Sequence, residues 1–140
     1  MTITEIHAKH TFAANCYVVR SEKNNAFVVD PGAEGENIIG FMKEHGITPR
    51  MILLTHGHFD HVGAVKDLQA AWPGLPVYIS PKDQELLEGD DKTGALARRF
   101  IRDNSPYVFT ADGALREGED LTLDELTIRV METPGHTRGS

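Results

Sequence analysis

The chain has 140 residues, of which 40% are hydrophobic and 25% charged, and its formal net charge is -7. Domains cluster near roughly 100–150 residues, so we expect residues 1–140 to form a single domain. The absence of an apolar run of roughly 20 residues excludes a membrane helix, and the acidic balance argues against a nucleic-acid partner, because such binding relies on Lys and Arg at phosphates.

The N-terminal segment gives no sign of export. Residues 1–5 lack a basic stretch followed by an apolar one, so we expect a cytoplasmic location. The single cysteine, Cys16, cannot form an internal disulfide and lies in an apolar, strand-like run. It is therefore expected to be a buried, unreactive thiol.

The first third of the chain predicts three strands and then a helix. β-rich runs at residues 3–7, 16–20 and 26–30 are separated by polar turns, which is typical of strands. Residues 38–45 then carry apolar side chains at helical spacing. Gly46 follows them where a left-handed C-terminal cap is common.

A second unit of strand, helix and strand comes next. Residues 51–54 form a short apolar run bounded by turn signals, which predicts a buried central strand. Apolar residues at helical spacing between Val65 and Trp72 predict a second helix. Pro73 ends this helix before a short strand at residues 77–79.

The last part of the chain predicts less regular structure before a hairpin. Residues 89–92 are expected to be a polar loop, and residues 95–102 a helix of moderate amphipathicity. Residues 121–123 and 126–130 alternate apolar and polar side chains around a tight turn, which indicates a β-hairpin. Strands that alternate with helices predict an α/β fold.

Three imidazoles and a carboxylate directly follow the predicted central strand, at His56, His58, Asp60 and His61. Polar side chains at a strand end gain nothing from core packing, and each needs a partner. Imidazole and carboxylate are the usual ligands of catalytic zinc, whereas structural zinc sites are typically rich in thiolates. His56 and His58 can point the same way from an extended backbone. Asp60 and His61 can then reach a neighbouring volume, so two adjacent metal ions become feasible.

A further histidine lies far downstream. His136 sits in a Pro-Gly-His turn after the strand-like residues 126–131. A histidine after a strand is well placed to meet a ligand cluster at the same end of a sheet, where it would supply a third neutral imidazole to the first metal. The isolated histidines His7, His10 and His45 are expected to be ordinary surface or core residues.

These motifs resemble the metallo-β-lactamase superfamily over nearly the whole chain. The THxHxDH pattern at residues 55–61, the Gly-His turn ending at His136 and the Val-Asp-Pro-Gly turn at residues 29–32 stand in the family's order and approximate spacing. The Asn-Cys-Tyr of residues 15–17 and the longer string of residues 54–63 are similar to the small bacterial glyoxalase II-like hydrolases. The resemblance implies an α/β fold of the metallo-β-lactamase type, an αββα sandwich.

The resemblance also implies a role for each site residue. The first metal would be bound by His56, His58 and His136. Asp60 and His61 would bind part of the second metal, with Asp60 also catalytic as acceptor of a proton from the attacking water. Asp30 would orient a ligand imidazole through a hydrogen bond, although an aspartate before proline also simply forms a turn. Zinc is the expected cofactor, as one or two ions, and iron or manganese would accept the same ligands.

One departure from the family's pattern concerns the C-terminal end. The family continues past the Gly-His turn with a bridging aspartate, a later histidine and covering helices, whereas this sequence stops at Ser140. We therefore expect a domain that lacks the C-terminal part of the fold and an incomplete second metal site. Exposed sheet surface drives association, so we also expect a homodimer, a domain-swapped dimer or poor solubility.

The expected reaction is hydrolysis by metal-activated water, with a small acyl thioester such as a hydroxyacylglutathione as the substrate. A phosphodiesterase or nuclease of this fold would use the same ligands, but the sequence shows no Lys/Arg stripe. A sulfur dioxygenase relative would hold a single iron through two histidines and one carboxylate. Flavodiiron relatives carry a glutamate at the position of His58, which argues against them. The non-enzyme alternative is a catalytically incomplete metal-binding or interaction subunit.

Overall fold

The structure, a computed structural model, describes residues 1–9, 14–88 and 109–140. The predicted loop at residues 89–92, the predicted helix at residues 95–102 and His10 lie outside the described residues. None of the helices in the described part of the chain is long and apolar enough to cross a membrane.

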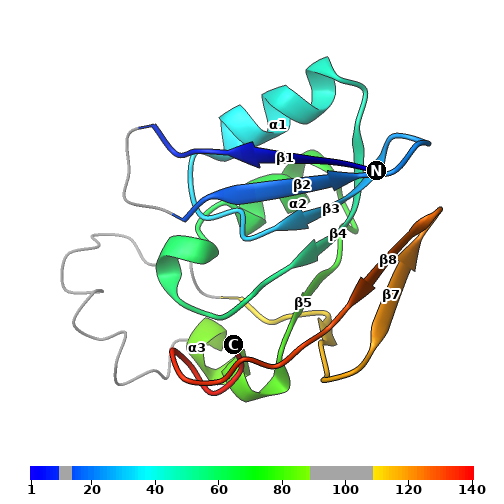
Figure 1. The fold of residues 1–140 in the computed structure, drawn as a ribbon. Coiled ribbons are helices and arrows are strands. Elements are labelled where there is room, and N and C mark those ends of the chain that lie inside the picture. Colours follow the sequence, from blue (N-terminus) through cyan, green and yellow to red (C-terminus); the bar gives the residue numbers. More distant parts are fainter. Residues whose placement is uncertain (10–13, 89–108) are drawn as a thin grey trace.

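Six strands form one mixed sheet in the order β1-β2-β3-β4-β5-β6 (Figure 1). Their bounds are Thr2–Ile6 for β1, Cys16–Arg20 for β2, Asn25–Val29 for β3, Thr48–Leu53 for β4, Val77–Ile79 for β5 and Gly113–Ala114 for β6. The first three strands are antiparallel neighbours. From β3 to β6 each neighbouring pair is parallel, as expected where helices connect successive strands.

Two helices cover one face of this sheet (Figure 1). They are α1, Gly35–Glu44, and α2, Val65–Ala71. Ile38 and Met42 of α1 and Leu68 of α2 pack in one cluster with Val28 and Ile52 of the central strands. Burial of these side chains, rather than helix propensity, therefore holds both helices in place.

A β-hairpin covers the opposite face. It consists of β7, Asp120–Leu123, and β8, Leu126–Arg129, as the alternating pattern predicts. Leu126 is buried against Val19, Phe27 and Leu53, which alternate along their strands with the residues that face the helices. Helices, the six-stranded sheet and the hairpin are stacked in this order, which gives the α/β fold class that the sequence predicts.

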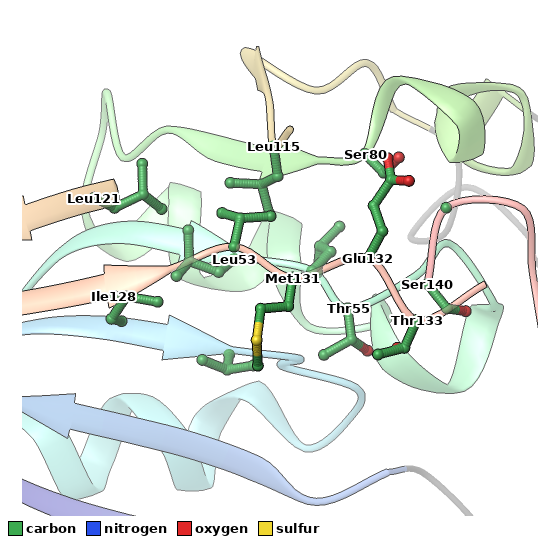
Figure 2. A pocket seen from close by; sticks show the side chains of 14 residues that line it. Leu53, Thr55, Ser80, Leu115, Leu121, Ile128, Met131, Glu132, Thr133 and Ser140 are labelled. Atoms are coloured by element: carbon green, nitrogen blue, oxygen red, sulfur yellow. The ribbon is translucent and has the colours of Figure 1, made fainter. Parts of the chain in front are cut away.

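The space between the two sheets holds an apolar cavity of about 250 Å³. Figure 2 shows Leu53, Leu121 and Ile128 lining it, with Thr55 and Thr133 at the end toward the C-terminal segment. Association of two copies through exposed sheet surface stays a prediction.

The structure differs from the predicted elements mainly at their ends. The third strand ends at Val29 because Asp30 has a left-handed backbone with φ of +50°. β4 begins at Thr48 rather than residue 51 and includes Pro49, a residue type that usually lies outside such a strand. A shift in the β3–β4 register at Ala26, the partner of Pro49, accommodates the missing N–H.

The thiol of Cys16 is buried, as the sequence predicts. Its residue is only 2% exposed and belongs to the cluster between sheet and helices. Burial, together with the negative charge of Asp30, raises the pKa of Cys16 to about 12. The thiol should therefore be inert at neutral pH.

The rate of alkylation measures the reactivity of the Cys16 thiol directly. At pH 8 the folded protein should react with iodoacetamide roughly 1,000-fold more slowly than the urea-unfolded chain, because the fraction of reactive thiolate falls about tenfold for each unit of pKa. Mass spectrometry of quenched samples gives both rates. Comparable rates in the two states would contradict the buried position of Cys16.

Candidate metal centre

The His-rich motif begins where a buried central strand ends. β4 stops at Leu53, and the N–H of Leu54 donates one more ladder hydrogen bond to the carbonyl of Tyr78 at 3.0 Å. The chain then leaves the sheet through residues 55–58 and enters the short 3-10 helix Phe59–His61. The histidines therefore lie outside the carboxyl ends of parallel strands, where ligand sites of open α/β sheets are commonly found.

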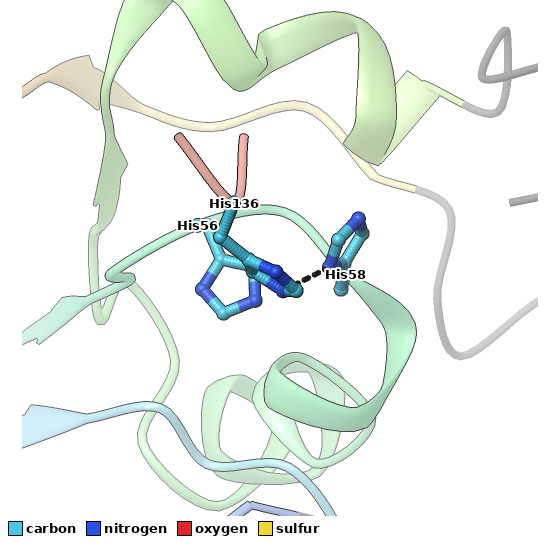
Figure 3. A group of neighbouring side chains, drawn as sticks. All are labelled: His56, His58 and His136. Carbon is cyan, nitrogen blue, oxygen red and sulfur yellow. Dashed lines mark hydrogen bonds between the residues drawn. The ribbon is translucent and has the colours of Figure 1, made fainter. Parts of the chain in front are cut away.

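Three imidazoles meet at this edge of the sheet. One ligand atom each of His56, His58 and His136 lies within 4.8 Å of the other two (Figure 3). The ring centroids of His58 and His136 are 4.7 Å apart, and Nδ1 of His58 is 3.0 Å from Nε2 of His136. The structure thus brings His56 and His58, which are two positions apart, together with His136, which is 78 positions beyond His58.

A chain of hydrogen bonds orients the innermost imidazole. The hydroxyl of Thr55 donates to the carboxylate of Asp30 at 2.6 Å, and the backbone N–H of Thr55 donates to the same group at 2.8 Å. Since that hydroxyl has a single proton, it accepts from Nδ1–H of His56, 3.0 Å away. Nε2 of His56 is left with a free lone pair, is buried, and finds no hydrogen-bond partner among the described residues.

The charge state of His56 agrees with this assignment. Burial, with the neighbouring imidazoles of His61, His58 and His136, lowers its pKa to about 4, against an opposing influence of Asp30. His56 is therefore neutral near pH 7, the form in which imidazole binds a metal. A buried, neutral nitrogen without a partner fits a metal ion better than it fits an ordinary core histidine.

His61 and Asp60 lie beside the three imidazoles. The ring of His61 is 3.9 Å from that of His56, and its Nδ1 is 2.8 Å from the carboxylate of Asp30. Its Nε2 is 3.7 Å from the carboxylate of Asp60. Burial lowers the pKa of His61, but the hydrogen bond to Asp30 and the charges of both carboxylates outweigh burial and raise it. Asp30 therefore serves two histidines, one directly and one through Thr55.

The remaining described histidines are away from this cluster, as predicted. His7 is exposed and hydrogen-bonds to Asn15 at 2.9 Å, and His45 is exposed at the end of α1. The sequence motifs do not reveal every contact around these histidines. Thr55 appears in the sequence only as one letter of the THxHxDH motif. Asp83, whose carboxylate accepts hydrogen bonds from Gly57 and Thr137 beside the histidines, has no signal beyond that of a polar residue ahead of a helix.

The comparisons with known proteins agree with this geometry. The family model of the metallo-beta-lactamase superfamily matches residues 11–140. The chain is 35% identical over 136 residues to a hydroxyacylglutathione hydrolase, GloC, of Haemophilus influenzae, covering 96% of this chain and 62% of that protein. It matches the crystal structure of the BLEG-1 B3 metallo-beta-lactamase with a TM-score of 0.83 and 33% identity, over 99% of this chain and 65% of that one.

A second solved structure is similar as well. The protein TTHA1623, crystallised in a di-iron-bound form, matches with a TM-score of 0.71 and 38% identity, over 89% of this chain and 58% of that one. The chain thus spans roughly three-fifths of the length of each of these relatives.

Proposed function

Because its residues 11–140 match the family model, the chain belongs to the metallo-beta-lactamase superfamily, and we propose that it is a metal-dependent hydrolase of small acyl thioesters. The observation that carries the proposal is the convergence of three imidazoles, His56, His58 and His136, together with the buried Nε2 of His56, which has no hydrogen-bond partner among the described residues. Three histidine ligands with an open position are a common catalytic zinc set.

The proposed assignment of ligands follows the two groups of side chains. His56, His58 and His136 would hold the first metal ion. Asp60 and His61 would contribute to a second ion, because both lie beside the first group without belonging to it. Asp30 would keep these ligands oriented through its hydrogen bonds with Thr55 and His61.

The chain's own residues would then support hydrolysis in distinct ways. A divalent metal ion supplies Lewis-acid chemistry, which activates water for attack on an acyl carbon at neutral pH. The carboxylate of Asp60, 35% exposed, would accept the proton that the attacking water loses. A thiolate leaving group needs no proton from the protein, which makes a thioester a suitable substrate for this chemistry.

The substrate and the metal are supported by the relatives. A hydroxyacylglutathione hydrolase is among the curated proteins that the chain resembles, and we propose a substrate of that class. Zinc is the proposed cofactor because the clustered donors are histidines. Iron is the alternative, since a similar structure holds two iron ions and imidazole binds both metals.

Metal analysis combined with a thioester assay tests the proposal. The purified protein, supplied separately with zinc or iron and then desalted, should retain at least one ion per chain by elemental analysis. It should release free thiol from S-D-lactoylglutathione, and a chelator should stop the release. Retention of metal without thioester hydrolysis would overturn the substrate class and favour the non-catalytic metal-binding alternative. A protein that retains no metal would overturn the proposed function as a whole.

A further inference from the structure

Asp83 is a buried acidic residue that lies between the two segments carrying the histidines. It ends the 3-10 helix Pro81–Asp83, directly before α3, Gln84–Glu88, and is only 1% exposed. A carboxylate is almost never buried this fully unless its oxygens are paired. The hydrogen-bond partners of Asp83 therefore indicate its role.

Those partners belong to both histidine-bearing segments. One oxygen of Asp83 accepts from the backbone N–H of Gly57 at 3.1 Å, between His56 and His58. The same oxygen accepts from the hydroxyl of Thr137 at 2.7 Å, next to His136. Its other oxygen accepts from the backbone N–H of Gly139 at 2.8 Å. A single carboxylate thus contacts residues directly adjacent to all three clustered histidines.

A side chain on Gly57 or Gly139 would crowd the atoms around Asp83. A Cβ on Gly57 would lie 2.7 Å from Cβ of Leu86 and 3.1 Å from the carbonyl oxygen of Asp83. A Cβ on Gly139 would lie 2.8 Å from an oxygen of Asp83 and from Ser80. The backbone of each segment therefore reaches the carboxylate directly, which fixes its position more firmly than contact through a long side chain would.

We infer that Asp83 is a positioning residue that holds His136 in register with His56 and His58. This inference rests on the proposed metal site. The histidines come from segments distant in sequence. Asp83 is not one of the clustered ligand residues, but it accepts hydrogen bonds from Gly57 and Thr137, which lie beside them. Groups that orient metal ligands in this way typically change metal affinity by about 10–100-fold when they are removed.

Asp83→Asn is the most informative substitution, because it keeps the shape of the side chain. The amide has only one acceptor oxygen, so its NH₂ group must face at least one of the N–H or O–H donors of Gly57, Thr137 and Gly139. We expect the affinity for zinc, measured by competition with a chromophoric chelator, to fall about 10–100-fold. We also expect the visible absorption bands of the cobalt-substituted protein to shift, because those bands report ligand geometry.

Lys82→Gln is the matched control. Lys82 precedes Asp83 and pairs with Glu132 of the C-terminal segment at 2.8 Å, but this ion pair is solvent-accessible. Exposed ion pairs contribute little, so this variant should keep zinc affinity within about twofold and leave the cobalt spectrum unchanged.

Thr137 offers a second pair of variants in case Asp83→Asn fails to fold. Thr137→Val removes the hydroxyl that donates to Asp83, whereas Thr137→Ser keeps it. The valine variant should show the weakened affinity and the shifted cobalt bands, and the serine variant should restore both. A role in general stability alone would lower the melting temperature without moving the cobalt bands.

The metal-free protein provides an independent readout. The amide proton of Gly57 or that of Gly139, whichever faces the new NH₂ group, should lose exchange protection in Asp83→Asn, as followed by NMR. Zinc affinity and cobalt bands equal to those of the wild type, despite this loss, would overturn the positioning role alone. A wild-type protein that binds no metal would overturn the proposed function and the role of Asp83 together.

Discussion

Replacing His136 with alanine should weaken zinc binding by at least about 100-fold and abolish thioester hydrolysis. Removing a group that merely orients a ligand costs about 10–100-fold, so removing a ligand costs no less. His136 is exposed, so replacing its side chain leaves the core intact. Chelator competition measures the affinity, and circular dichroism checks that the variant is folded.

His45→Ala is the matched control for this experiment. His45 is also an exposed histidine, but it lies at the end of α1 and outside the cluster. Its removal should change neither zinc affinity nor activity. Equal losses in the two variants would show that the three clustered imidazoles have no special part in metal binding.

Phe27→Ala should lower the free energy of unfolding by about 3–5 kcal/mol, as is typical when a large aromatic side chain is removed from a core. Phe27 is 1% exposed and packs between the six-stranded sheet and the hairpin, with Leu53 and Leu126. Because domains are stable by only about 5–15 kcal/mol, this variant should be close to unfolding at 25 °C. Urea denaturation, monitored by circular dichroism, gives the difference in free energy of unfolding between the variant and the wild type.

Ile3→Ala serves as the reference substitution in the same sheet. Ile3 lies in β1 and is 57% exposed, so its truncation should cost no more than about 0.5 kcal/mol. A similar cost for both variants would mean that the hairpin does not pack on Phe27 in solution.

Much of the fold follows from local patterns in the sequence. The alternation around Asp124 predicts the hairpin, and the apolar run at residues 51–54 predicts the central strand, because side-chain periodicity records which faces are buried. β6 has only two residues, Gly113–Ala114, and α3 only five, so neither is long enough to show a period. Elements this short are set by packing against neighbouring segments and not by a sequence pattern of their own.

The candidate site likewise has a part that the sequence predicts and a part that it does not. Its histidines can be found from the sequence, because several imidazoles seldom cluster after a buried strand without a ligand to bind. Of the contacts that hold them, the sequence predicts a hydrogen bond with Asp30 but not those made by Asp83 and Thr55. Asp83 meets Gly57 across 26 positions and Thr137 across 54, so its partners are set by how the segments pack and not by any motif. The direction of the Thr55 hydroxyl likewise depends on where the backbone places Asp30.

The 78 positions between His58 and His136 also bear on how the protein would resist unfolding. An ion held by both would act as a reversible cross-link, closing a loop that includes α2, β5, α3, β6 and the hairpin. Closing a long loop removes much of the freedom of the unfolded chain, so coordination would stabilise the native state beyond the strength of the bonds themselves.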